Sequence, residues 1–330
     1  MGTLLAGHGG RQSPREVAVI VSRIVGANLA RRLAACLGVA VLVGVAGCSS
    51  DTANAKRLET KPAPRRGEVP PLADRYEDFD AATFDATSAN VDNQYLPQNP
   101  GSRLVLAGSD QHGNRRSAHR VEIIVTDLTR KIDGVETAVV WERDFVKGTL
   151  TEAELMYLAQ DTAGNVWHLG EYSEVYEDGE LLGATGFLQG YLPGARAGIV
   201  MPADPRTGTP SFSEGLGPPP INWNDRGRVV ATGRTTRVPA GRYDDAVVIE
   251  EYSEGEPTSF QLKYYAPGVG NVRVGWRGED ESREKLVLTK AVTLTASEMD
   301  AVRAAAGELE GRARMYGTPP PAERRPPTSG

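Results

Sequence analysis

The sequence predicts a mostly β protein: one large, curved antiparallel sheet, or half-barrel, built from two duplicated β-meanders, with one helix near the C-terminus. Three observations predict it. Apolar and polar residues alternate over long stretches, and a period of two gives a strand one buried and one wet face, as in antiparallel sheets. Short turn signals containing Gly, Asp or Asn separate these stretches. A strand–turn–strand pattern also recurs within the chain, which indicates an internal duplication.

Residues 1–47 have the composition of a secretion signal. Arg31 and Arg32 precede a run without charge, from 33 to 47, that is mostly Ala, Val, Leu and Gly. A basic region, a short apolar region and small residues at its end are the ordered features of such signals. The apolar run is shorter than the about 20 residues that a membrane-spanning helix needs. We therefore expect this segment to direct export and to be removed.

The end of the signal carries a motif for lipid attachment. Val45, Ala46 and Gly47 stand directly before Cys48, and this order resembles the lipobox of bacterial lipoproteins. The resemblance implies cleavage between Gly47 and Cys48 and transfer of diacylglyceryl and palmitate-type chains to Cys48. Two or three such chains anchor stably, since each buried methylene contributes about 0.8 kcal/mol. We expect a protein on the extracytoplasmic side of the cell membrane. The alternative is an uncleaved buried helix with a chance cysteine.

The composition of the mature chain excludes several classes of function. Cys36 lies within the signal, so Cys48 is the only cysteine of the mature chain, which excludes disulfides and thiol catalysis. Removing the signal takes away five Arg and one Glu, which leaves 32 basic and 42 acidic side chains and a net charge near −10. Such a surface is expected to repel nucleic acid and anionic lipid headgroups, so we expect no nucleic-acid partner.

Polar, proline-containing segments flank the folded part. Residues 48–89 are predicted to be a lipid-anchored, disordered tether, because the stretch is polar and contains four prolines between 62 and 71. Residues 318–330 contain five prolines and are predicted to be a disordered tail. The half-barrel domain is expected over 90–296, followed by a C-terminal helix over 297–317.

The predicted strands rest on alternation, and the predicted helix on helical spacing. Turn signals such as Asp133-Gly134 and Asp178-Gly179 separate the strands. The alternating residues are Val121, Ile123 and Val125; Val135, Thr137, Val139 and Trp141; Phe260, Leu262, Tyr264 and Ala266; and Leu286, Leu288, Val292 and Leu294. The helix is indicated by Met299, Val302, Ala306 and Leu309, which recur at its period.

Two hairpins repeat the same pattern. Leu155, Tyr157 and Ala159 lead into a Gly-Asn-Val turn, and so do Leu262, Tyr264 and Ala266; each hairpin follows a longer one, over 121–144 and 229–252. We predict two four-stranded meanders side by side, with Tyr157 matching Tyr264 and Ala159 matching Ala266. A sheet of eight to ten strands has to curl because strand twist accumulates. Its concave face is expected to be apolar, with Leu155, Tyr157, Leu262 and Tyr264 as candidate ligand-lining residues.

Two short motifs resemble those of exported bacterial half-barrel domains. The run 265–270, Tyr-Ala-Pro-Gly-Val-Gly, looks like a hairpin common in such domains, and the run 93–101, with Asn93, Tyr95 and Pro97, resembles their opening segment. The general shape is similar to LolA-like lipoprotein carriers, and the chain as a whole resembles lipoproteins of actinobacteria. The resemblance covers roughly residues 90–295. It implies a fold and no particular activity.

An unusual stretch between the meanders, Gly183–Gly227, is rich in Gly and Pro yet carries large apolar side chains. A long irregular segment inside a compact domain is usually functional or well packed. One interpretation is a plug that completes the core. The other is a lid across the mouth of the half-barrel, with Phe187, Tyr191, Met201 and Trp223 as its candidate residues. Burial is the simpler explanation of apolar side chains in a loop, so we favour the plug.

The chain contains no sequence motif that predicts catalysis or a cofactor. Gly-x-Ser-x-Gly and His-Glu-x-x-His are absent from the sequence, and the Gly268-Val269-Gly270 run lacks the Lys-Ser/Thr ending of a phosphate loop. His112 is expected in a polar turn, His119 facing the core, and His168 in a hairpin strand. Their spacing does not predict a metal site. We expect no cofactor and no metal.

Paired carboxylates are the one feature that could support chemistry. Glu142 and Asp144 share a strand face, and Glu250 and Glu251 are adjacent. Such pairs act as acid and base in glycosidases. In so acidic a chain they are also expected on solvated faces with no function, so the chain is not expected to be an enzyme.

Three functions remain open at this level. The first is a non-enzymatic lipoprotein that binds or carries a lipid or other apolar ligand of the cell envelope. The second is a structural or interaction scaffold of the envelope, without a ligand. The third, which the sequence favours least, is a carbohydrate-active hydrolase. The sequence identifies neither the ligand nor protein partners.

Overall fold

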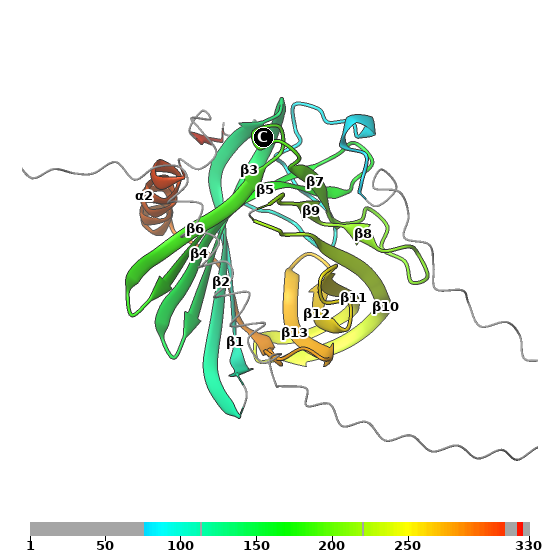
Figure 1. The fold of residues 1–330 in the computed structure, drawn as a ribbon, viewed down its shortest axis with the longest axis vertical. Helices are drawn as coiled ribbons and strands as arrows, with labels where there is room; N and C mark the ends of the chain where they lie inside the picture. Colours follow the sequence, from blue (N-terminus) through cyan, green and yellow to red (C-terminus); the bar gives the residue numbers. More distant parts are fainter. Residues whose placement is uncertain (1–75, 113, 220, 314–321, 326–330) are drawn as a thin grey trace, which may run out of the picture.

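The structure is a computed structural model that describes residues 76–112, 114–219, 221–313 and 322–325 (Figure 1). The predicted signal, Cys48 and most of the predicted tether lie outside the described residues. Among the described residues, no helix is both long enough and apolar enough to span a bilayer.

The described chain is almost entirely β (Figure 1). Its two helical elements are the 3-10 turn η2 (Phe79–Ala81) and the α-helix α2 (Ala296–Arg312). The strands are β1 (Ser102–His112), β2 (Arg115–Ile132), β3 (Val135–Val146), β4 (Thr149–Gln160), β5 (Val166–Glu177), β6 (Glu180–Leu188), β7 (Arg196–Met201), β8 (Phe212–Ser213), β9 (Gly215–Leu216), β10 (Asp225–Val238), β11 (Gly241–Ser253), β12 (Ser259–Ala266), β13 (Gly270–Gly278), β14 (Lys285–Thr293) and β15 (Glu323–Arg324).

All the strands belong to one antiparallel sheet, which confirms the predicted fold class. The order runs β8-β10-β11-β12-β13-β14-β1-β2-β3-β4-β5-β7-β9, so β10–β14 and β1–β5 are two consecutive meanders. The two meanders lie side by side, as the sequence predicted, and they are joined where β14 pairs with β1 over eight residue pairs. The sheet is not closed, since its pairing path ends at β8 and β9. Figure 1 shows β10–β13 curled beneath the layer formed by β2–β5.

The repeated hairpins occupy corresponding places in the two meanders. In β4–β5 the register shifts directly after Tyr157, and in β12–β13 it shifts directly after Tyr264. Ala159 and Ala266 then pair with Trp167 and Gly270 at the hairpin ends. Equivalent irregularities at equivalent positions favour a duplication. The predicted superposition of the two whole meanders stays a prediction.

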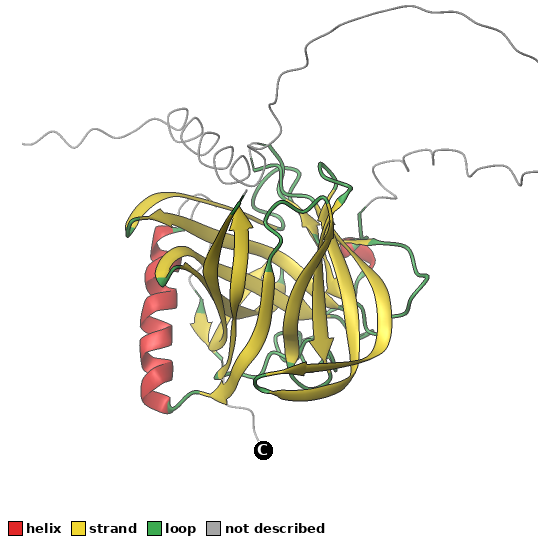
Figure 2. Ribbon diagram, turned by 90° about the horizontal axis from the view of Figure 1, so that it is seen from below, coloured by secondary structure: helices red, strands yellow, loops and turns green. Residues whose placement is uncertain are grey.

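The helix α2 covers the face of β2–β4 that is turned away from β10–β13 (Figures 1 and 2). It buries the four predicted residues, Met299, Val302, Ala306 and Leu309. Thr295 caps it by accepting a hydrogen bond from the Glu298 backbone, while the Glu298 side chain accepts one from Thr295, a reciprocal capping box. The predicted end at 317 is too late, because the helix ends at Arg312.

The apolar core between the meanders draws side chains from both. Val140 and Leu158 of the first meander pack in one cluster with Val247 and Ile249 of the second, and Met201 joins them fully buried. A second cluster continues it around Leu106 and Leu288. Much of the face that the meanders turn toward each other is therefore filled by the protein itself.

The segment Gly183–Gly227 is not irregular as predicted, because it contains β7, β8, β9, the end of β6 and the start of β10. Phe187 and Met201 are fully buried, and Trp223 stacks on Phe187 with ring centroids 5.1 Å apart. The single residue Glu214 joins β8 to β9, so this segment links the two ends of the sheet. These placements agree with the plug and leave the lid interpretation without a free apolar surface at Phe187 or Met201.

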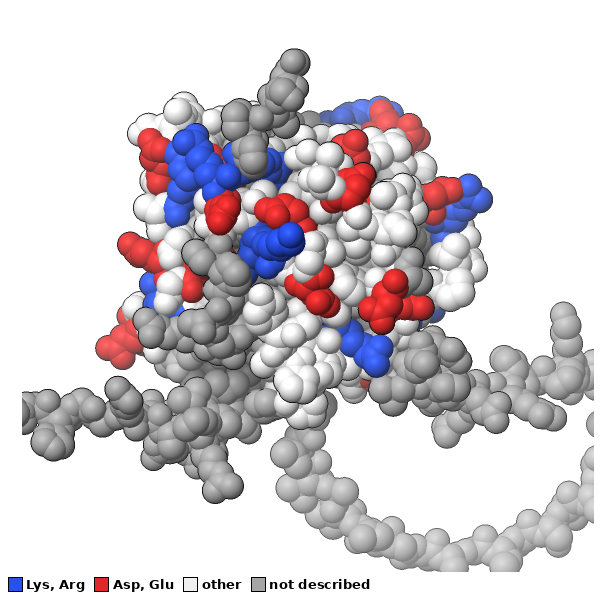
Figure 3. All heavy atoms as spheres, turned by 90° about the horizontal axis from the view of Figure 1, so that it is seen from above, with Lys and Arg blue, Asp and Glu red and all other residues white. Residues whose placement is uncertain are grey.

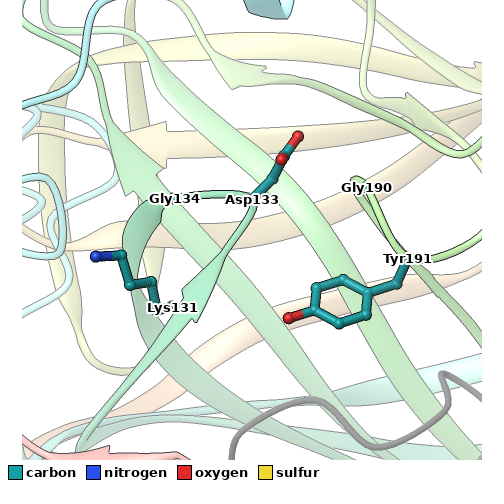
Figure 4. A pocket seen from close by; sticks show the side chains of 5 residues that line it. All are labelled: Lys131, Asp133, Gly134, Gly190 and Tyr191. Atoms are coloured by element: carbon teal, nitrogen blue, oxygen red, sulfur yellow. The ribbon is translucent and has the colours of Figure 1, made fainter.

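Tyr191 is the exception within this segment, because it lines an open depression of about 390 Å³. Figure 4 shows its ring directed toward the β2–β3 turn, where Lys131, Asp133 and Gly134 form the opposite wall. Gln189 donates a hydrogen bond to Asp133 across this gap. The depression thus joins a turn to the start of the plug segment and lies apart from the core between the meanders.

Both predicted disordered flanks extend too far into the folded part. Phe79 and Phe84, within the predicted tether, pack edge-on against Trp167 at 5.7 and 6.1 Å. In the predicted tail, β15 pairs with β2, and the Arg325 backbone donates to the Asp127 carbonyl. Aromatic burial and strand pairing outweigh the polar composition from which the flanks were predicted.

Candidate functional site

Strand β3 separates two charged sites that lie on opposite faces of the sheet. Side chains alternate between faces along a strand. Trp141 and Arg143 therefore point toward α2, and Glu142 and Asp144 point toward the second meander, on the same face as the core residue Val140. We describe the two sites as the helix pocket and the inner acidic cluster.

The four predicted ligand-lining residues do not come together. Leu155 and Tyr157 are fully buried, but they pack toward α2. The Tyr157 hydroxyl lies 3.2 Å from both Arg130 Nη1 and Glu310 Oε1 of the helix. Leu262 and Tyr264 are half-buried in β12, and Arg273 stacks over the Tyr264 ring. Alternation predicts which residues share a face, but not which face becomes the inside.

The helix pocket is a depression of about 350 Å³ between α2 and the sheet. Its wall combines apolar side chains with two guanidinium groups and one carboxylate. The lining residues are Arg103, Ile124, Trp141, Arg143, Leu294, Glu298, Ala301, Val302 and Ala305. Alanines on the helix face keep α2 from filling this space.

Positive charge exceeds negative charge beside the pocket. Glu122, which is 1% exposed, forms ion pairs with Arg103, Arg120 and Arg143, and Arg103 Nη2 lies 2.9 Å from its carboxylate. Burial, together with repulsion by Arg103, lowers the pKa of the Arg120 and Arg143 guanidinium groups. One carboxylate thus faces three guanidinium groups. The local charge is the reverse of the acidic average of the chain.

Three buried donors of the pocket have no hydrogen-bond partner among the described residues: Trp141 Nε1, Arg103 Nε and Arg143 Nε. The Arg143 guanidinium lies 4.4 Å from the centroid of the Trp141 ring, stacked over its face. A buried Trp N–H usually finds an acceptor. The pocket therefore presents donors and apolar walls, and what is missing among the described residues is an acceptor.

The inner acidic cluster collects carboxylates from many strands. The first meander contributes Glu142 and Asp144 from β3, Glu152 and Glu154 from β4, and His168 and Glu171 from β5. The other members are His119 of β2, Glu214, Asp225 of β10, Glu251 of β11, Lys263 and Tyr265 of β12, and Glu284 before β14. By contrast, the outer surface seen from above carries acidic and basic side chains intermixed (Figure 3).

Burial raises the pKa of several carboxyl groups in this cluster. It raises the pKa of Glu142 and of Glu171 to about 8, with repulsion from neighbouring carboxylates added. Burial likewise raises the pKa of Glu154 and Glu214 well above the usual range. Glu154 and Glu171 hydrogen-bond each other and so share a proton. Glu142 and Glu154 are nevertheless only half-buried by surface area, so they lie deep in the fold but still touch solvent.

Two cations partly offset these charges. Lys263 Nζ lies 2.5 Å from Glu251 Oε2, and the carboxylates around it raise its pKa. His119 lies between Asp144, at 3.3 Å, and Glu284, at 2.7 Å. Burial lowers the pKa of His119, but its hydrogen bonds to these two carboxylates outweigh burial and raise the pKa to about 10. The expectation that His119 faces the core is confirmed.

Two buried polar atoms of the cluster have no hydrogen-bond partner among the described residues: Glu214 Oε1, which is an acceptor, and His168 Nε2. Both residues are more than nine-tenths buried. Burial lowers the pKa of His168 to about 4, so its ring is neutral near pH 7, and Nε2 lies 3.7 Å from Glu171. The Glu214 carboxyl thus lacks a donor, whereas the helix pocket lacks acceptors.

The sequence identified part of this arrangement. It placed Glu142 and Asp144 on one face, and the structure does so too. Of the second predicted pair, Glu251 lies in the cluster beside Lys263. Glu250 is fully buried on the opposite face of β11 between Arg228 and Arg277. Across the described residues, no three His, Cys, Asp or Glu side chains are arranged to hold a metal ion.

The comparisons with known proteins give a distant likeness of fold. No protein-family model matches the chain, and no curated protein matches it. A "putative exported protein with YmcC-like fold" from Bacteroides fragilis is similar at TM-score 0.38 and 12% identity, over 61% of this chain and 100% of that one. A "putative lipoprotein" from Parabacteroides distasonis is similar at TM-score 0.34 and 13% identity, over 61% and 99%. Scores of this size leave function to be argued from the sites.

Proposed function

We propose that the protein is an extracytoplasmic lipoprotein, anchored through Cys48, that binds an amphiphile with an anionic head in the helix pocket. The observation that carries the proposal is the set of three buried donors without partners, on Trp141, Arg103 and Arg143, beside an apolar wall. A buried donor left unpaired costs about 1–3 kcal/mol. An acceptor that binds there recovers this cost.

The head of the ligand is an anion, because the donors are mostly guanidinium groups. Arg binds carboxylate and phosphate through paired N–H donors, and such charge-assisted bonds are roughly twice as strong as neutral ones. Glu122 balances only one of the three arginines that surround it. The carboxylate of Glu298 lines the same pocket, where Thr295 donates two hydrogen bonds to it, and its charge balances a second arginine. Three arginines against these two carboxylates leave one positive charge for the bound anion.

The rest of the ligand is apolar, because the remaining wall is. Ile124 and Leu294 face Ala301 and Val302 of α2 across the pocket. A volume of about 350 Å³ is within the range of small-molecule sites, roughly 300–1,000 Å³, and near its lower end. It takes an anionic head and the first part of an acyl chain, while the remainder of the chain extends out along the helix.

This site replaces the concave face as the place of binding. Clusters of apolar side chains fill the space between the meanders, and the inner acidic cluster occupies much of the rest. An uncharged acyl chain is poorly matched to that environment. A scaffold without a ligand is the competing function, and binding measurements decide between the two.

The test is native mass spectrometry of the full-length lipoprotein in a non-ionic detergent, with three added probes of equal chain length. Oleate and lysophosphatidate carry anionic heads, and oleyl alcohol carries none. We expect both anions to bind and the alcohol to bind at least about tenfold more weakly, since a lost charged hydrogen bond is worth about 1.5–3 kcal/mol. Comparing the two anions distinguishes carboxylate from phosphate.

Matched variants locate the site. Arg143→Gln and Arg103→Gln remove pocket donors, whereas Arg120→Gln removes the third arginine beside Glu122 but no pocket donor. We expect the first two to weaken anion binding strongly, because each removes a donor and a charge, and the third to weaken it less, because it removes a charge only. Equal binding of all three probes, or no binding of any, contradicts the proposal and favours the scaffold.

A further inference from the structure

We propose that the inner acidic cluster is a second binding site, which takes a small organic cation with several N–H donors, such as a polyamine. This site is independent of the helix pocket. The proposal rests on the charge balance of the cluster, on a buried carboxyl oxygen of Glu214 without a partner, and on the cations that the cluster already accommodates.

The charge balance requires either protons or a cation. Carboxylates converge from β3, β4, β5, β10 and β11 and from Glu214, while Lys263 and His119 are the basic groups facing them among the described residues. Like charges in a partly buried site cannot all ionise without compensation. In the unliganded protein, protons held by the Glu residues provide it. A bound polycation provides it without them.

The unpartnered oxygen of Glu214 shows where a donor is missing. Glu214 is 7% exposed, and its Oε1 has no hydrogen-bond partner among the described residues. It lies among Glu251, Lys263, Asp225 and Glu171, so it faces into the cluster. A buried acceptor is rarely left unpaired, and an N–H donor from a ligand satisfies this one.

The chemistry of the cluster fits an ammonium group better than a metal ion. Within the described part of the chain, no three ligating side chains are arranged to coordinate one ion. Lys263 already places an ammonium 2.5 Å from Glu251 and keeps its charge in spite of burial. A chain of amines, each bonded to a separate carboxylate, uses the same geometry. The carboxylates of Glu142, Glu152 and Glu154 are only half-buried, so solvent reaches the cluster.

Binding of such a cation releases protons. Glu142 and Glu171 hold protons near pH 7 in the free protein, because burial raises their pKa to about 8. A nearby cation lowers these pKa values again and expels the protons. Affinity is therefore expected to rise with pH up to about 8 and then to level off. Each proton released corresponds to about tenfold in affinity per pH unit.

The experiment is isothermal titration calorimetry of spermidine into the full-length lipoprotein in non-ionic detergent, near pH 7. Two buffers of different ionisation enthalpy report the number of protons exchanged. We expect net proton release with spermidine and no saturable heat with Mg²⁺ at the same ionic strength. Proton uptake, no exchange, or equal binding of Mg²⁺ overturns the proposal.

Three variants test whether spermidine binds at the inner acidic cluster. Glu214→Gln keeps the size of the side chain and is expected to weaken spermidine binding about tenfold. Lys263→Met removes the competing internal ammonium and is expected to strengthen it. Glu308→Gln, on the exposed face of α2, makes the same substitution outside the cluster and is expected to leave spermidine binding unchanged. Equal weakening by Glu214→Gln and Glu308→Gln, or weaker binding by folded Lys263→Met, contradicts an inner site.

Discussion

The two faces of β3 carry side-chain charges of opposite sign, although the residues concerned, 141–144, are consecutive in the strand. Trp141 and Arg143 face α2 and leave donors unsatisfied, whereas Glu142 and Asp144 face the second meander among excess acceptors. On the side facing α2, the arginine charges are partly compensated by ion pairs with Glu122. On the side facing the second meander, protonation of buried carboxyl groups lowers the negative charge. A sheet between two differently charged compartments can thus support two unrelated sites, and a shift of register by one residue would exchange them.

The largest expected effect is a loss of stability that distinguishes the ion-paired face of β3 from the protonated one. Glu122→Gln removes the one carboxylate that three arginines share, and we expect it to lower the free energy of unfolding by about 3 kcal/mol, as when one partner of a buried ion pair is removed. Glu142→Gln replaces a carboxyl that is mostly protonated near pH 7, so its cost is expected to be below about 1 kcal/mol. Urea denaturation at pH 7 measures both. Equal costs would mean that the two faces do not differ as described.

Sequence alternation was enough to place Glu142 and Asp144 together and His119 inside, because these relations lie within one strand or one hairpin. It could not bring Glu142 near Lys263, since that contact depends on how the whole sheet curls. The helix pocket was missed for the same reason. Arg103, Trp141 and Ala305 come from three separate elements, and the sequence does not say which face α2 covers.

The stretch Gly183–Gly227 was misjudged because its glycines were taken as signs of irregular backbone. A Cβ at Gly198 would meet the backbone of Glu214 and Gly215 at 2.4 Å, and one at Gly215 would meet the rings of Trp223 and Phe187 near 3 Å. These glycines allow strands and aromatic rings to pack closely. In this segment the glycines therefore allow close packing and do not indicate irregular backbone.

The second-largest expected effect is a dependence of the free energy of unfolding on pH, which arises from titratable groups of the inner acidic cluster. Glu142 and Glu171 have an unfolded pKa of 4.5 and a folded pKa of about 8, so the folded state binds more protons between these values. Their contribution to stability is complete below pH 4.5 and is lost as pH rises to about 8. His119, raised from 6.5 to about 10, acts in the same direction at higher pH.

Urea midpoints measured between pH 5 and 9 test this dependence. We expect the midpoint to fall with rising pH in the wild type and to fall less in Glu142→Gln. Arg143→Gln, on the outward face, is expected to lower the whole curve without changing its slope. A curve that rises between pH 5 and 8 would show that the carboxylates of the inner face are ionised and individually paired.

A smaller effect concerns the helix that closes the outward site. Thr295→Ala removes the side-chain half of the capping box and is expected to cost about 1 kcal/mol. Because α2 forms one wall of the helix pocket, a looser first turn should also weaken binding of an anionic amphiphile, while spermidine binding on the inner face stays unchanged. Thermal unfolding and the two binding assays measure these effects together. Loss of both ligands would mean that the helix supports the whole sheet and not one face.

The smallest change in stability is expected where an unsatisfied donor is removed. Trp141→Phe keeps an aromatic ring beneath the Arg143 guanidinium but deletes Nε1. The fold loses some buried apolar area and is relieved of an unpaired N–H, and these opposing terms leave a net change below about 1 kcal/mol. The anionic head loses one donor of three, so its affinity should fall by about five- to tenfold. Urea denaturation and native mass spectrometry with oleate measure the two quantities separately. A variant that binds as well as the wild type but is clearly less stable would mean that the indole N–H serves the fold, and the helix pocket would then lack the donor that makes it specific.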